Sequence, residues 1–193
     1  VSDYMEHVGY DCRIMGIPKT IDNDLAITDH CPGFGSAAKY IATSIMEVRR
    51  DISVYTKGSL IIFEIMGRNA GWLAAAAELA NVAGEGPDLV YLPETVFDID
   101  RFFEKAAKIY RETGNCVVAV SEGVKDKDGR FISEYGSDLA KQKDAFGHSQ
   151  MGGLAGYLVS EAKRRIEGVK VRGIELSLLQ RCAAHCASKT DVE

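Results

Sequence analysis

The chain has 193 residues, of which 46% are hydrophobic, and a formal net charge of -5. This length suffices for one sizeable core and is short for two complete domains. The mild charge and the lack of a long apolar run give no sign of a nucleic-acid or membrane partner, and five scattered cysteines outline no disulfide framework. We therefore expect one main domain of a cytoplasmic protein.

Short apolar runs alternate with helical stretches along the chain, a pattern typical of a parallel α/β sheet. Strands are predicted at 12–17, 60–66, 89–92, 116–120 and 171–179. Helices are predicted at 36–50, 71–81, 100–113 and 153–166, with Ser36 as the first N-cap and Gly114 as a C-terminal stop. A hairpin or extended loop is expected at 124–132. The predicted fold class is α/β, with three layers and helices on both faces of a mostly parallel sheet.

A polar loop follows the first predicted strand and contains Lys19, Thr20, Asp22, Asn23 and Asp24. One carboxylate there can take the proton of a sugar hydroxyl, a second can hold Mg²⁺, and a lysine can neutralise a polyphosphate. If the loop is extended, Thr20, Asp22 and Asp24 point the same way. The alternative is an acidic surface turn, because Asp and Asn are common turn residues.

Polar side chains also follow three later strands, with Arg68, Glu122 and Arg181 at the second, fourth and fifth strand ends. Ligands of open α/β sheets bind outside the carboxyl ends of the strands, so these residues and the polar loop are expected to share one crevice. Arg68 follows a glycine turn that enters an alanine-rich helix, where free backbone N–H groups suit a phosphate. A surface ion pair is the alternative for Arg68.

Arg172 opens the fifth predicted strand, whereas Arg181 closes it. A strand of that length places the two residues roughly 30 Å apart at about 3.3 Å per residue. They should not meet in one crevice of one subunit. Arg172 would then reach a neighbouring subunit or make a structural contact.

Four motifs in this order resemble the phosphofructokinase family over nearly the whole chain: Pro18 to Asp24 (PKTIDND), Met66-Gly67-Arg68, Glu122-Gly123 and Leu179-Gln180-Arg181. The resemblance implies a phosphotransferase of glycolysis that converts fructose 6-phosphate to fructose 1,6-bisphosphate. It implies that Asp22 is the base for the 1-hydroxyl, and that Thr20 and Asp24 support the transferring group and its Mg²⁺, Asp24 directly or through water.

The same resemblance implies the sugar contacts. Arg68 would also act in catalysis, Arg181 would bind the 6-phosphate, and Arg172 would come from the neighbouring subunit of a homodimer or homotetramer. The residues that would hold the sugar itself are Met66, Gly67, Arg68 and Glu122. The chain departs from the family pattern at Leu178, where a histidine or aromatic residue is common. The chain also has no counterpart of the family's second cross-subunit arginine. Lys57 lies near that position, but a lysine supplies only charge and not the two parallel hydrogen bonds of an arginine.

The phosphoryl donor is expected to be pyrophosphate, with ATP as the alternative. Lys19 and the segment 28–35 resemble the pyrophosphate-dependent branch of the family, and an ammonium can sit against a compact diphosphate while blocking room for a nucleoside. Some ATP-dependent members share this lysine. Both donors therefore remain open from the sequence.

By this resemblance, residues 1–34 are the tail of the donor domain with the catalytic loop, 35–184 form the sugar-phosphate domain, and 185–193 begin a return segment. Family members have a glycine-rich donor region before the position of Val1 and continue past Glu193, so we expect a piece that does not turn over by itself. Two alternatives are a non-catalytic sugar-phosphate-binding or regulatory module and a domain with packing roles alone. Retention of both Asp22 and Asp24 favours catalysis.

Overall fold

The computed structural model describes residues 1–136 and 153–193. At its centre lies a four-stranded parallel sheet in the order β2-β3-β1-β4. Strands β1 and β3 are buried along nearly their whole length because both sheet faces are covered, which is why they read as apolar runs. The strands are β1 Leu60–Ile65, β2 Leu89–Tyr91, β3 Cys116–Ser121 and β4 Val171–Glu175.

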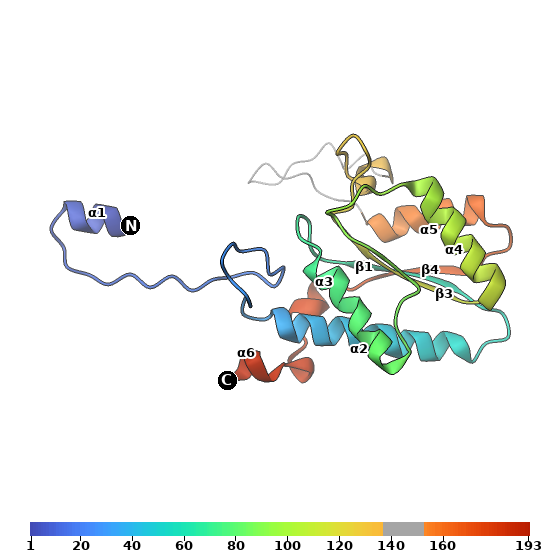
Figure 1. Cartoon of the computed structure of the whole chain (residues 1–193), viewed down its shortest axis with the longest axis horizontal. Coiled ribbons are helices and arrows are strands. Elements are labelled where there is room, and N and C mark those ends of the chain that lie inside the picture. Colours follow the sequence, from blue (N-terminus) through green and yellow to red (C-terminus); the bar gives the residue numbers. More distant parts are fainter. Residues whose placement is uncertain (137–152) are drawn as a thin grey trace.

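Helices cover both faces of the sheet (Figure 1). Helices α2 (Phe34–Ser53) and α3 (Trp72–Ala76), with the 3₁₀ helix η1 (Ala77–Ala83), pack on one face through an apolar cluster that includes Ile41 and Phe63. Helices α4 (Ile99–Thr113) and α5 (Leu154–Arg165) pack on the other. The predicted three-layer α/β fold is confirmed. The shorter elements are α1 Ser2–His7, η2 Ile132–Gly136, η4 Ser177–Arg181, η5 Ala184–Cys186 and α6 Lys189–Val192.

Helix α4 shows the end signals expected from its sequence. The Asp98 carboxylate accepts hydrogen bonds from the Asp100 and Arg101 backbone N–H groups, each at 3.0 Å. Gly114 follows the last turn with φ of 83°, a left-handed conformation that glycine adopts without a Cβ clash. The predicted stop at Gly114 is confirmed.

Helix α2 begins differently from the prediction. Ser36 is not the N-cap, because the helix starts at Phe34 with Gly33 at the cap position. The orphan N–H groups of Gly33 and Ser36 instead donate to the Asp191 carboxylate, both at 2.7 Å. His30 Nε2 lies 3.0 Å from the same carboxylate. The C-terminal segment therefore caps α2, which ties residues 188–193 to the domain.

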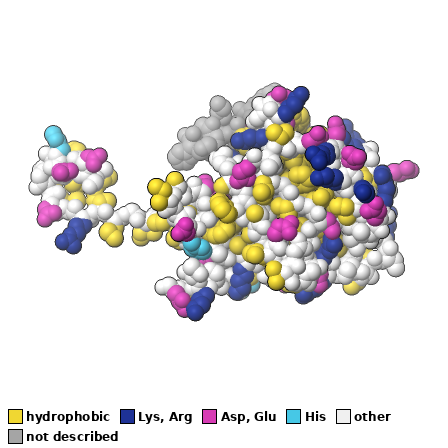
Figure 2. Space-filling view, viewed as in Figure 1, with side chains coloured by type: hydrophobic (Ala, Val, Ile, Leu, Met, Phe, Trp, Pro, Cys, Tyr) yellow, Lys and Arg dark blue, Asp and Glu magenta, His cyan; other side chains and the backbone are white. Residues whose placement is uncertain are grey.

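The predicted strand at 12–17 is absent from the described residues. This segment lies apart from the sheet, between α1 and the rest of the chain, and Figure 2 shows hydrophobic side chains along it. Met15 is 87% exposed and Ile17 84% exposed. An apolar run becomes a strand only when a neighbouring strand pairs with its backbone groups, and no such neighbour lies beside it within 1–136 or 153–193.

The last strand is shorter than predicted. Strand β4 ends at Glu175, and the chain turns at Ser177, whose φ is +45°, into η4. The separation of roughly 30 Å expected between Arg172 and Arg181 assumed one straight strand at about 3.3 Å per residue, and that assumption is wrong. At 124–132 an antiparallel bridge between Lys125 and Phe131 confirms the expected hairpin-like loop. No helix among the described residues is long and apolar enough to cross a membrane.

Candidate active site

The carboxyl ends of β1 and β3 are joined by a compact hydrogen-bond network. Ser121 Oγ donates to the Gly67 carbonyl at 2.6 Å and accepts from the Gly123 N–H at 3.1 Å. The Glu122 N–H donates to the Ile65 carbonyl at 2.8 Å. The Met66-Gly67-Arg68 and Glu122-Gly123 motifs therefore lie side by side at one sheet edge, as the sequence predicted.

Two glycines make this close approach possible. Gly67 has φ of +121°, and a Cβ there would lie 2.4 Å from the Ala70 carbonyl oxygen. A Cβ on Gly123 would lie 2.0 Å from the Arg68 carbonyl oxygen. A larger residue at position 123 would push the Arg68 backbone away from the β3 strand end, and one at position 67 would displace the Ala70 carbonyl.

Asp22 lies in a turn in which its backbone N–H donates to Thr20 Oγ1 at 3.1 Å. Its Oδ1 atom is buried, and so is Nε of Arg68, yet neither has a hydrogen-bond partner among the described residues. Burial, followed by repulsion from Asp24, raises the pKa of Asp22, while the charges of Lys19 and Arg68 oppose the rise. An ionisable group with a raised pKa and an unsatisfied oxygen is typical of a general base.

Glu122 belongs to the same charged group. Burial raises the pKa of Glu122, and repulsion from Asp22 raises it further. The charge of Arg68 and a hydrogen bond from the Gly67 N–H lower it. The structure therefore brings Asp22, Arg68 and Glu122 within electrostatic reach of one another. Two carboxylates face one guanidinium, which favours a polar ligand that supplies further hydrogen bonds.

Asp24 faces a different environment from Asp22. Asn23, between them, has φ of +57°, so the loop is not extended there and the two carboxylates do not share one face as they would in a strand. Asp24 is exposed and lines a cleft of about 600 Å³ together with Asn69 and Trp72. The loop thus presents one half-buried and one solvent-facing carboxylate.

Met66 and Glu122 line a smaller cavity of about 190 Å³, which Glu64, Glu175 and Gln180 also line. Burial raises the pKa of Glu64 to about 7, although its Oε2 accepts a hydrogen bond of 2.7 Å from the Ala155 N–H. Sequence reasoning missed Glu64. The available signal was an ionisable residue that interrupts an otherwise apolar buried strand.

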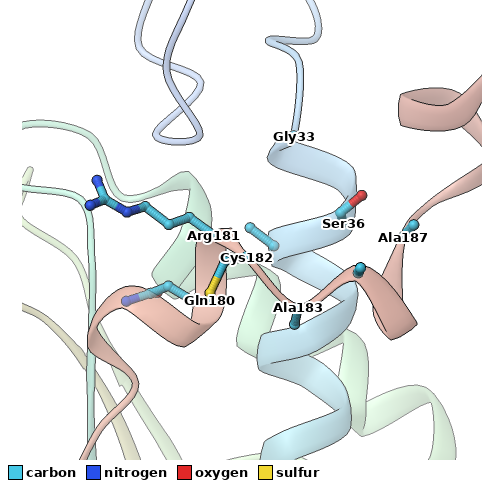
Figure 3. A pocket seen from close by; sticks show the side chains of 9 residues that line it. Gly33, Ser36, Gln180, Arg181, Cys182, Ala183 and Ala187 are labelled. Carbon is cyan, nitrogen blue, oxygen red and sulfur yellow. The ribbon is translucent and has the colours of Figure 1, made fainter.

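Arg181 lies on η4 and is exposed; its side chain points away from α2 (Figure 3). It lines a cavity of about 270 Å³ with Ser36 and Gln180, not the cavity of Glu122. Its neighbour Gln180 is 2% exposed and accepts a hydrogen bond from the Met66 N–H at 3.2 Å. Arg181 is thus one residue from the contact between η4 and the end of β1. Sequence reasoning assigned no role to Gln180.

Arg172 is not brought together with the other predicted residues. It is exposed near the start of β4, where it pairs in register with Ile61 of β1. Asp22, Arg68 and Glu122 instead gather at the carboxyl ends of the strands. Lys57, which precedes β1, and Lys19 are also exposed.

The residues fit a magnesium ion held mainly by its substrate. Residues 1–136 and 153–193 contain no group of three or more His, Cys, Asp or Glu side chains placed to hold a metal. Mg²⁺ does not require one, because it commonly uses one or two carboxylates with phosphate oxygens and waters. The exposed Asp24 carboxylate meets that requirement.

A protein-family model described as phosphofructokinase matches residues 2–174. The chain belongs to the phosphofructokinase family. A pyrophosphate–fructose 6-phosphate 1-phosphotransferase from Xanthomonas campestris is 46% identical, over 100% of this chain and 46% of the relative. An ATP-dependent 6-phosphofructokinase from Nostoc is 34% identical over 88% of this chain and 43% of the relative.

The fold is shared with solved phosphofructokinases. The crystal structure of a pyrophosphate-dependent phosphofructokinase from Nitrosospira multiformis superposes with a TM-score of 0.80 at 40% identity, covering 99% of this chain and 44% of that one. The chain therefore spans less than half the length of the family members it matches.

Proposed function

We propose that this phosphofructokinase chain carries the sugar-phosphate side of a site that transfers a phosphoryl group from pyrophosphate to the 1-hydroxyl of fructose 6-phosphate. The observation that carries the proposal is the half-buried Asp22 carboxylate, whose Oδ1 has no partner among the described residues, placed beside Arg68. Binding alone does not need such a group. The names of the relatives from Xanthomonas and Nitrosospira support the same reaction.

The proposed chemistry begins with proton removal by Asp22. Its carboxylate accepts the proton of the 1-hydroxyl as that oxygen attacks the terminal phosphorus of the donor. A new O–P bond forms, the bridging P–O bond breaks, and inorganic phosphate leaves. Arg68 offsets the negative charge that gathers on the transferring group, and its charge favours the ionised form of Asp22 by opposing the rise in its pKa. Mg²⁺, held by Asp24, would neutralise the donor oxygens.

The sugar would occupy the edge formed by Met66, Gly67 and Glu122, with its 6-phosphate at Arg181. The Gln180 contact to Met66 supports this pairing because it holds η4 against the end of β1. In this proposal residues 1–34 belong to the donor side, 35–184 to the sugar side and 185–193 to a return segment. Arg172, exposed and away from the strand ends, would serve a neighbouring subunit of a homodimer or homotetramer.

Pyrophosphate is the proposed donor because Lys19 adds a positive charge within electrostatic reach of Asp22. A compact diphosphate uses such a charge, with Thr20 beside it, whereas a nucleoside needs additional room. The Nostoc relative is named for ATP, so ATP is the second donor to be tested.

Replacement of the base tests the proposal. The kinetic experiments use the full reading frame that contains residues 1–193, because the chain spans less than half of its relatives. Asp22→Ser should lower kcat by about 100- to 10,000-fold while fructose 6-phosphate still binds. Asp51→Ser, at an exposed aspartate near the end of α2, is the matched control and should leave turnover unchanged. Unchanged turnover of Asp22→Ser would refute the assignment.

A further inference from the structure

Asn23 is the most buried polar residue of the loop that carries Asp22 and Asp24, with 7% of its surface exposed. Its Oδ1 accepts a hydrogen bond from the Cys31 N–H at 2.8 Å, and its Nδ2 donates to the Asp29 carbonyl at 3.3 Å. Cys31 is itself fully buried. Both ends of the amide are thus used to fasten the loop to the segment before α2, and the amide is not needed for the chemistry proposed above.

The backbone of Asn23 has a second consequence. Its φ of +57° is left-handed, a conformation that asparagine tolerates better than most non-glycine residues. In an extended strand Asp22 and Asp24 would point the same way, and the turn at Asn23 breaks that pattern. Asp22 is left half-buried near Arg68, whereas Asp24 is exposed on the cleft beside Asn69.

We propose that Asn23 is a positioning residue for phosphoryl transfer: its two side-chain hydrogen bonds and left-handed backbone hold Asp22 toward the sugar hydroxyl and turn Asp24 toward the donor. This inference rests on the proposed function. Because both ends of its amide bond to the protein backbone, Asn23 acts through the two carboxylates. Its contribution therefore appears in kcat rather than in sugar affinity.

Three substitutions separate the two features. Asn23→Gly keeps the left-handed backbone and removes both side-chain hydrogen bonds. Asn23→Ala removes the hydrogen bonds and also disfavours the backbone. Asn23→Asp keeps an acceptor for the Cys31 N–H and tolerates the backbone. Asn81→Ala is the matched control, because Asn81 is an exposed asparagine whose side chain bonds only to Glu78 within η1 among the described residues.

In the full reading frame, kcat should fall about 10- to 100-fold in Asn23→Gly, because small displacements of a reacting group are costly. The fall should be larger in Asn23→Ala and smaller in Asn23→Asp, with KM for fructose 6-phosphate unchanged throughout. A residue with a merely structural role would lower kcat and the affinity for fructose 6-phosphate together, whereas a positioning residue lowers kcat alone.

A folded Asn23→Gly protein with wild-type kcat would overturn the inference, and so would equal losses in kcat and sugar affinity. If Asn23→Ala and Asn23→Gly fail to fold, Asn23→Asp decides: lowered kcat with unchanged KM supports positioning, and unchanged kcat refutes it. A wild-type protein inactive with both donors refutes the proposed function as well, whereas an active wild type with an equally active Asn23→Gly refutes this inference alone.

Discussion

Ser121 Oγ donates a 2.6 Å hydrogen bond to the Gly67 carbonyl and so fastens the end of β3 to the loop that carries Arg68. Both groups are buried. The same oxygen accepts a hydrogen bond from the Gly123 N–H, so the residues on both sides of Glu122 are held in place. One hydroxyl therefore holds two of the predicted motifs in register.

Removal of that hydroxyl should destabilise the protein. Ser121→Ala leaves a buried carbonyl and a buried N–H without this partner, at a cost of about 1–3 kcal/mol in the free energy of unfolding. Ser133→Ala is the control, since Ser133 is 1% exposed and its hydroxyl has no hydrogen-bond partner in the described part of the chain. Urea unfolding of residues 1–193 measures both. Equal effects of the two substitutions would contradict the role of Ser121.

Gly123 and Gly156 should respond to alanine in opposite directions. Gly123→Ala places a Cβ 2.0 Å from the Arg68 carbonyl oxygen, so the strand ends must separate and both stability and turnover should fall. Gly156 lies in α5 with nothing within 4 Å of an added Cβ, and Gly156→Ala should stabilise by about 0.5–1 kcal/mol. Thermal unfolding distinguishes them; a neutral Gly123→Ala would show that the close packing is not required.

The acid limb of the pH–rate profile should follow Asp22. Its raised pKa means that activity is lost on acidification at a higher pH than for an ordinary aspartate. Because Asp24 raises this pKa and Arg68 lowers it, Asp24→Asn should move the limb to lower pH and Arg68→Gln to higher pH. The pH at which the acid limb falls is read separately from the decrease in maximal rate that either substitution causes. Shifts in the same direction would exclude Asp22 as the titrating base.

The cap on α2 predicts an acid-sensitive stability. Burial alone would raise the pKa of Asp191, but hydrogen bonds from Ser36, His30 and Gly33 outweigh it and hold the pKa well below its usual range. The folded pKa is therefore lower than the unfolded value of about 3.9, so the stabilisation is present above that pH and lost as the pH falls further.

Asp191→Asn should lower stability at neutral pH by about 1 kcal/mol, the usual contribution of a cap. The difference from wild type should shrink as the pH falls below about 4. Melting temperatures measured across that range test this, with the exposed Asp51→Asn as the control. A difference in melting temperature between wild type and Asp191→Asn that stays constant with pH would mean that the ionised Asp191 carboxylate contributes nothing to stability.

The central strands could be predicted because parallel strands covered on both faces are continuous apolar runs, as β1 and β3 are. The same rule wrongly extended the last predicted strand through Leu178 and Leu179, which are 58% and 59% exposed. Apolar composition does not reveal the left-handed turn at Ser177, where the chain leaves the strand direction. The rule also predicted a strand at 12–17, where no partner strand lies among the described residues.

The part of the site that lies at the carboxyl ends of the strands could be predicted from the sequence. Arg68, Glu122 and Arg181 were expected to converge with Asp22; Arg68 and Glu122 do, whereas Arg181 lines a different cavity from Glu122. The cap from Asp191 was not predictable, because it comes from 155 residues beyond Ser36 and capping rules consider only neighbours in sequence. The division of Asp22 from Asp24 depends on one dihedral angle at Asn23, which no residue pattern determines.

Phosphoryl transfer to fructose 6-phosphate is tested most directly by initial rates of fructose 1,6-bisphosphate formation with pyrophosphate and with ATP. The rates are measured with Mg²⁺ present on protein expressed from the full reading frame that contains the chain. We predict turnover with pyrophosphate, and much slower turnover with ATP. Protein that binds fructose 6-phosphate but forms no fructose 1,6-bisphosphate with either donor would contradict the proposed function.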